Sequence, residues 1–147
     1  MEKIRGKKMF QESYISKLGI PSLVAYLLSY RTDSTVMELE VEMEEELPLQ
    51  LLPLRCEAVT EAVREIVEAF KSHAQSSDGE PNVLNLQFEV QDSGLLLDFV
   101  YQGQYNSSEL AAELKRKLLQ KGNVLIVEES AFEQGEAAFT VRLPFHT

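Results

Sequence analysis

The sequence predicts an α+β fold, a two-layer α/β sandwich in which helices cover one face of a mixed sheet. Three observations predict it. The segment 54–75 has apolar residues at steps of three and four, which is the spacing of one stripe along an α-helix. Shorter segments on either side alternate apolar and polar residues, as strands with one buried face do. The chain has 147 residues, which is the length of one domain.

The elements are expected in the order helix, strand, long helix, strand, strand, helix, strand, strand. Proline fits the first turn of a helix, so the first helix is expected to start at Pro21, with a turn at 31–34. Asn106 and Glu109 have the spacing of a capping pair that starts the last helix, and Gly122 is placed to end it. The last three strands and the first are expected to share one sheet. The expected strands are 37–44, 83–90, 95–101, 124–127 and 139–143, and the first two helices are 21–30 and 54–75.

The long segment 54–75 has two interpretations. It is a central core helix, or its polar rim at 65–73 lines a ligand site. A helix of this length spans about 33 Å, enough to cross a small domain. Cys56 lies on the apolar stripe, so it is expected to be a core residue and not a nucleophile. The stripe consists of Leu54, Cys56, Val59, Val63, Ile66, Val67 and Phe70.

The segment 37–44 alternates without a miss, and every second residue is a glutamate. A row of carboxylates can suggest cation binding. However, side chains two residues apart on a strand are separated by about 7 Å along it, which is too far for one compact calcium site. The better interpretation is a solvated face that prevents pairing at the edge of the sheet.

Composition excludes several classes of protein. The net charge of −10 and the pI of about 4.7 leave no basic footprint for nucleic acid. The single cysteine excludes an internal disulfide and suits a cytoplasmic protein. No apolar run is long enough to predict a membrane span. The only basic segment is 1–17, which is expected to be an arm or a frayed helix ahead of a domain at 18–147.

Four segments carry a likeness to a known family. Residues 129–144, ESAFEQGEAAFTVRLP, are similar to the ending ESAPGQGTRVTVRLP, and residues 115–127, KRKLLQKGNVLIV, are similar to RERVELLGGRLEI. Residues 65–74, EIVEAFKSHA, are similar to EALNNVVKHA, and residues 16–30 are similar to the passage that leaves a phosphorylated helical hairpin. In this order the chain resembles, over roughly 16–144, the ATP-binding domain of sensor histidine kinases, the GHKL or Bergerat fold.

The resemblance assigns family roles to positions at which this chain carries other residues. The family's asparagine that holds magnesium matches Ala69, its lysine before the helix histidine matches Ser72, and its histidine matches His73. Its Asp-x-Gly-x-Gly box, whose aspartate binds adenine, reads YQGQY at 101–105, so only the glycine at position 103 is retained. The glycines of its phosphate-lid box match Glu109 and Ala112. The remnant pocket positions are therefore Glu65, Glu68, Ala69, His73, Tyr101 and Gly103.

These departures imply a degenerate domain with no catalytic residue, no metal ligand and no cofactor. Loss of the aspartate alone costs about 1.5–3 kcal/mol, or one to two decades of affinity. The implied function is a non-catalytic interaction or regulatory module in two-component signalling. Its partner would be a kinase, a response regulator or a second copy. In a homodimer the basic arm would pair with the acidic remainder, although the arm can equally be solvated.

The alternative is an active domain that binds Mg-ATP and phosphorylates a histidine on another chain or segment. In that case Glu65 would be the base or metal partner. The chain has two histidines, His73 and His146, and neither matches the family's phosphoacceptor. His73 is instead expected to end a helix, where its charge favours the helix dipole.

Overall fold

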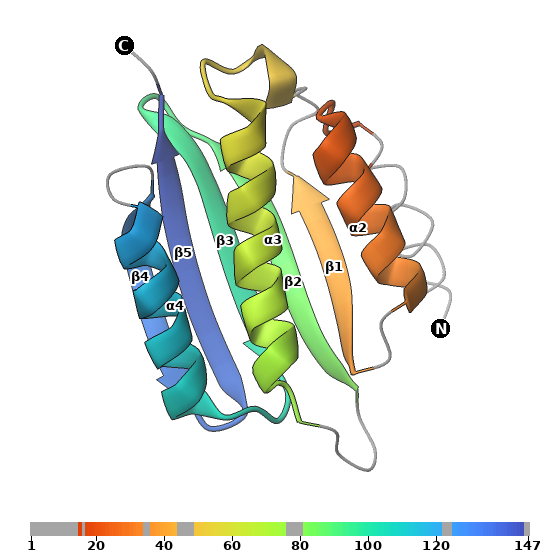
Figure 1. Cartoon of the computed structure of the whole chain (residues 1–147), viewed down its shortest axis with the longest axis vertical. Helices are drawn as coiled ribbons and strands as arrows, with labels where there is room; N and C mark the ends of the chain where they lie inside the picture. The colour runs from red at the N-terminus through yellow and green to blue at the C-terminus, as the bar shows by residue number, and fades with distance from the viewer. Residues whose placement is uncertain are drawn as a thin grey trace.

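The computed structural model describes residue 15 and residues 17–33, 36–43, 49–75, 81–121 and 125–145, with the backbone alone for 31–33 and 119–121. Most of the basic arm expected at 1–17 and the helix end expected at Gly122 lie outside these residues. Figure 1 shows the elements in chain order. They are α2 (Pro21–Asp33), β1 (Met37–Met43), the 3₁₀ turn η1 (Leu49–Leu51), α3 (Cys56–His73), β2 (Asn82–Val90), β3 (Gly94–Gln102), α4 (Ser107–Lys121), β4 (Ile126–Glu133) and β5 (Glu136–Pro144).

Five strands form one sheet in the order β1-β2-β3-β5-β4. Strands β1 and β2 are parallel and every other pair is antiparallel, so the sheet is mixed, as expected. The expectation that the last three strands and the first share one sheet is confirmed, and β2 belongs to the same sheet. β2 pairs along its length with β3 and joins β1 to the rest of the sheet.

The described helices lie on one face of the sheet, with α2 beside β1, α3 over the centre and α4 beside β4 (Figure 1). This confirms the two-layer α+β fold. Alternation of side chains along the strands produces it, because each strand sends every second residue under the helices. In β1, for example, Met37, Leu39 and Val41 are buried, while Glu38 is exposed.

Helix α3 supplies the centre of the core. Its buried residues include Val59, Val63, Ile66, Val67 and Phe70, as the stripe predicts, whereas Cys56 at its start is only half-buried. Each fully buried aliphatic or aromatic side chain contributes about 1.5–3 kcal/mol. The charges at the two ends suit the helix dipole, with Glu57 in the first turn and Lys71 and His73 in the last.

Several boundaries differ from expectation. Helix α3 covers Cys56–His73 and not 54–75, so Leu54 of the stripe lies before it, and the last strand begins at Glu136. The turn expected at 31–34 is helical up to Asp33, because no glycine or proline stops α2 at Tyr30. Strand β4 runs to Glu133 and meets β5 across Gln134 and Gly135, whereas the pattern predicts a strand at 124–127 only. A register shift between Val127 and Glu129 changes which residues of β4 face the helices. The apolar and polar residues of this strand therefore do not alternate regularly along the sequence.

The face of the sheet away from the helices is called the open face below. Register partners point to the same side, so the outward residues form rows that cross all five strands. One row reads Glu40, Asn85, Val100, Ala138 and Ala131. Among the described residues, the open face carries the carboxylates of Glu38, Glu40, Glu42, Glu89, Asp98, Glu128, Glu129, Glu133 and Glu136, and one base, Arg142.

The helix layer is balanced in charge by comparison. The described side chains of α3 and α4, with Arg55, include six carboxylates and six bases: Glu57, Glu61, Glu65, Glu68, Glu109 and Glu113 against Arg55, Arg64, Lys71, Lys115, Arg116 and Lys117. Among the described residues, the excess negative charge is therefore concentrated on the open face. Among the described helices, none is both long enough and apolar enough to cross a membrane.

Candidate functional site

The remnant pocket positions lie on α3 and at the end of β3, but they do not converge on one point. The C-terminal end of α3 meets the segment after β3, where Gln75 N donates to Gln104 O over 2.8 Å and Asn106 N donates to His73 O over 3.1 Å. This places His73, Tyr101 and Gly103 at one end of the domain. Glu65 and Glu68 lie further back along α3 and contact different helices.

Tyr101 fills the position that the resemblance gives to the adenine-binding aspartate. It is fully buried, its ring stacks on Phe70 with centroids 5.6 Å apart, and its edge meets the Tyr105 ring at 5.1 Å. Its hydroxyl donates to Gln104 O over 2.7 Å. Burial raises the pKa of Tyr101 above its ordinary value. The side chain is thus part of the aromatic core.

Tyr105 lies at the same end of the domain and links two segments at its surface. Its hydroxyl lies 2.6 Å from Glu133 O and 3.0 Å from Glu136 O, so it ties the segment after β3 to the β4–β5 turn. Tyr105 stands where the family's box has its last glycine, and a tyrosine would be strained there if the backbone required a positive φ. The described backbone has no non-glycine residue with positive φ, so Tyr105 sits there without strain.

Ala69 occupies the position of the family's magnesium ligand. It lies on the buried side of α3 and has no exposed surface. Its methyl group offers no oxygen or nitrogen to a cation. No group of three or more histidine, cysteine, aspartate or glutamate residues in the described part of the chain could hold a metal ion.

Gly103 is held against Asn82, a residue that the sequence did not single out. Asn82 is 3% exposed, its Nδ2 donates to Val36 O and Gln75 O over 3.0 and 2.9 Å, and its Oδ1 accepts from Gln104 N over 2.9 Å. Gly103 has φ +141°, and a Cβ there would lie 2.1 Å from Asn82 Oδ1. Asn82 therefore clamps three segments at this end of the domain. An asparagine between a loop and a strand is an ordinary turn residue, so no sequence signal marked it.

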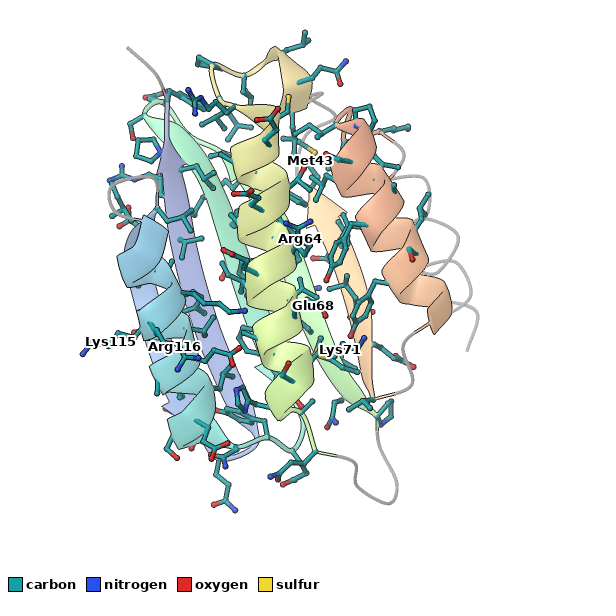
Figure 2. The ribbon with its side chains drawn as sticks, in the orientation of Figure 1. Met43, Arg64, Glu68, Lys71, Lys115 and Arg116 are labelled. Carbon is teal, nitrogen blue, oxygen red and sulfur yellow. The ribbon has the colours of Figure 1, made fainter. Side chains whose placement is uncertain are left out.

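Glu68 faces α2. Figure 2 shows Arg64, Glu68 and Lys71 on the side of α3 toward α2. The Tyr26 hydroxyl donates to Glu68 Oε2 over 2.6 Å, and Lys71 Nζ lies 5.4 Å from the centre of the Tyr30 ring. The Glu68 carboxylate is thus engaged by α2. Burial, followed by the bond to Glu68 and its negative charge, raises the pKa of Tyr26.

The Tyr26 contact predicts a loss of stability in alkali. Unfolded Tyr26 loses its proton near pH 10, whereas folded Tyr26 keeps its proton at higher pH. The unfolded state therefore binds fewer protons, and the free energy of unfolding falls as pH rises above about 10. Thermal unfolding followed by circular dichroism is expected to show a weaker pH dependence for Tyr26→Phe than for the parent. Glu68→Gln, which keeps an acceptor without the charge, is expected to be intermediate. An unchanged slope in both variants would contradict the assignment.

The His73 side chain and the backbone carbonyl of Glu65 contact α4. His73 is the last residue of α3, and its Nε2 lies 3.2 Å from Glu113 Oε1 while Nδ1 lies 3.7 Å from Glu109 Oε2. Lys117 Nζ donates to the Glu65 carbonyl over 3.3 Å and lies 3.6 Å from Glu113 Oε2. These contacts attach α4 to α3. Glu109 lies in the first turn of α4, with its N–H bonded to Asn106 Oδ1 as the capping pair predicts, and Ala112 lies in the same helix.

Together these contacts describe an end of the domain closed by its own side chains. Tyr101 and Ala69 are packed in the core, Gly103 abuts Asn82, and Tyr105 spans to the β4–β5 turn. Among these groups none is placed as a nucleophile beside a base. The arrangement provides packing and backbone hydrogen bonds at the position where the resemblance expects a purine.

One family matches most of the chain. It is described as "Sporulation initiation phospho-transferase B, C-terminal", and the match covers residues 19–144. No curated protein sequence matches the chain.

Solved structures of histidine kinases have a similar fold. Histidine kinase AdeS of Acinetobacter baumannii has a TM-score of 0.58 at 10% identity, over 86% of this chain and 65% of that chain. The nucleotide-free catalytic domain of histidine kinase ThkA has a TM-score of 0.55 at 11% identity, over 88% of this chain and 93% of that chain. At such low identity these likenesses show the histidine-kinase-like ATPase fold alone.

Proposed function

The chain belongs to the family of the C-terminal domain of sporulation initiation phosphotransferase B, and from this premise we propose that it is a non-catalytic interaction or regulatory module in two-component-type signalling. It keeps the histidine-kinase-like ATPase fold, and ATP binding has been lost. On this proposal the protein needs no cofactor and acts in the cytoplasm.

The observation that carries this proposal is the packing of Tyr101. Adenine recognition in the resembling kinases uses an aspartate at this position. Here the position holds a fully buried ring stacked on Phe70 and bonded to Gln104 O. Removing one hydrogen bond to a charged group lowers affinity by one to two decades, at about 1.5–3 kcal/mol. A buried ring in place of the aspartate lowers the affinity for adenine further, because adenine could reach this position only if the core opened.

The magnesium position supports the same conclusion. Ala69 is buried, and the adjacent Glu68 accepts a hydrogen bond from Tyr26. The carboxylate of Glu109, in the first turn of α4, would also repel a triphosphate at that end of the domain, since like charges raise the energy at close range. Neither the purine nor the metal-bridged phosphates of Mg-ATP therefore find the groups that hold them in the family.

The proposed partner is a protein, either a kinase or a response regulator, and a second copy of this chain is a further candidate. The family name includes a phosphotransferase, and in some phosphotransferases an emptied ATP domain serves as the platform for a response regulator. A domain that has lost its ligand but keeps its fold can still present surfaces in a fixed geometry.

Nucleotide titration tests the proposed function. Thermal unfolding with Mg-ATP and with Mg-ADP is expected to show no shift, because no native site binds them. A ligand at 100 times its dissociation constant would add about 2.7 kcal/mol, which is readily measured. Calorimetry on the same samples checks the result, with magnesium alone as the control. A dissociation constant below about 100 μM would overturn the proposal.

The alternative function is an active domain that binds Mg-ATP and phosphorylates a histidine on another chain or segment. Glu65 would then be its base or metal partner. Glu65 is half-buried on α3, and its carbonyl accepts a hydrogen bond from Lys117. Saturable Mg-ATP binding that Glu65→Gln weakens would favour this alternative, and the titration above decides between the two.

A further inference from the structure

We infer that the open face of the sheet binds a basic, amphipathic segment of a partner protein, through an apolar strip at Val100, Ala138 and Ala131 bordered by carboxylates. The inference rests on the proposed function as an interaction module and gives that module a surface and a partner chemistry. Figure 1 shows all three helices on the opposite side of the sheet, so among the described elements none covers this face.

The first support is the distribution of charge. The chain has a net charge of −10. The described part of the open face holds nine carboxylates and one arginine, whereas the helix layer is balanced. A general need for solubility would be met by charge spread over the whole surface. Concentration on one face instead creates a local negative potential that attracts a basic partner.

The second support is the apolar strip within this acidic face. Val100, Ala138 and Ala131 are register partners on β3, β5 and β4, so they lie side by side across three strands. All three are half-buried by their neighbours. Small side chains make the strip shallow, so that a partner's backbone can approach it. An apolar centre with a polar rim is the anatomy of a protein interface.

The carboxylates that border the apolar strip are close enough for a segment bound on the strip to contact them. Two residues along the strands from the strip are Glu133 and Glu136 on one side, and Glu129 and Asp98 on the other. This spacing is about 7 Å along each strand. Lysine or arginine side chains flanking an apolar segment can therefore reach both rows while the segment rests on the strip.

The third support is the energetic cost of the face to the isolated domain. Glu133 and Glu136 are register partners, and like charges directly opposite each other destabilise a sheet. The described base of this face, Arg142, lies at the other end of β5, about 20 Å along the strand, with Nε 2.8 Å from Glu128 Oε1 and Nη1 donating to Ser93 Oγ over 2.9 Å. A basic partner would offset this repulsion.

Charge also decides against other occupants. Two copies stacked open face to open face would bring the two acidic surfaces together, and like charges repel. Nucleic acid is repelled for the same reason. A lysine- and arginine-rich segment with apolar residues is the chemistry that matches both the strip and its rim.

A direct test uses a synthetic helical peptide made of lysine and leucine, with a glutamate–leucine peptide as the negative probe. We expect the full chain to bind the lysine peptide, with amide shift changes in NMR spectra on β3, β5 and β4. The double variant E133Q/E136Q is expected to bind about tenfold more weakly, since each exposed ion pair contributes modestly. The matched control E57Q/E61Q removes the same charge from exposed positions on α3 and is expected to bind as the parent does.

Two further measurements separate binding from folding. E133Q/E136Q is expected to unfold at a higher temperature than the parent, because a like-charge pair is removed, so weaker binding by it is not loss of structure. Ala131→Arg, at the sheet edge, places a base on the strip and is expected to abolish binding. Equal weakening by both double variants, or shift changes on α3 and α4, would overturn the inference. So would self-association that the double variant abolishes, which would assign the face to a second copy. None of these outcomes bears on nucleotide binding, so the proposed function is tested separately.

Discussion

Tyr101→Asp is expected to unfold most of the protein, although it restores the residue that binds adenine in the resembling kinases. Tyr101 has no exposed surface, and its ring contacts Phe70 and Tyr105. Truncating a buried aromatic ring costs about 3–5 kcal/mol, and an uncompensated buried carboxylate adds several more. A loss of about 5 kcal/mol or more is comparable with the whole stability of an ordinary domain.

Urea unfolding followed by circular dichroism measures this loss. Tyr101→Phe is the matched control, because it keeps the ring and removes only the hydroxyl bond to Gln104 O, at a cost of about 1 kcal/mol. Calorimetry with Mg-ADP completes the experiment. If Tyr101→Asp were folded and bound Mg-ADP, the space around position 101 would be a nucleotide pocket, and the proposed loss of ATP binding would be due to one side chain.

Gly103→Ala is expected to cost about 3–5 kcal/mol, because it combines a strained backbone with an overlap. Its φ of +141° is a conformation that residues with a Cβ rarely adopt. The added Cβ would lie 2.1 Å from Asn82 Oδ1 and 2.9 Å from Asn82 Cα. Asn82 cannot move aside without losing its bonds to Val36, Gln75 and Gln104.

Gly135→Ala is the control that measures only the cost of placing a residue with a Cβ in a positive-φ conformation. Gly135 has φ +80°, and no atom lies within 4 Å of an added Cβ. Its expected cost is about 1–2 kcal/mol in the same urea experiment. Equal costs at the two positions would show that the Asn82 contact adds nothing and that the domain tolerates rearrangement there.

The fold could be predicted from local patterns because each pattern reflects one buried face. The stripe on α3 and the alternation in β1, β2, β3 and β5 follow from the burial of one side of each element. Strand β4 lacks this signal because a register shift after Val127 interrupts its alternation. The parallel pairing of β1 with β2 joins segments far apart in the sequence, which local spacing does not encode.

For the candidate site, the sequence identified positions but could not predict the contacts that their side chains make. The resemblance identifies Tyr101 and Ala69 as replacements, and both lie in the buried core. It gives no account of Asn82, since the three partners of its side chain come from three separate segments. It also groups Glu65 and Glu68 with the pocket, whereas the Glu68 side chain is bonded to Tyr26 of α2 and the Glu65 backbone carbonyl accepts from Lys117 of α4. Side-chain direction on a helix depends on its neighbours, which the sequence of that helix does not contain.

The parallel pairing of β1 with β2 has a consequence for how the chain reaches this fold. Met37 and Asn82 are register partners, so their pairing closes a loop that contains α3. Strands β4 and β5 meet across a turn of only two residues, Gln134 and Gly135. Loop-closure entropy grows with the logarithm of length, so attaching β1 costs roughly 2–3 kcal/mol more in chain entropy than closing that hairpin. The pairing of β3 with β5 closes a loop of similar length, which contains α4. The entropic cost of assembly therefore falls on these two pairings, and the local hairpins can form before them.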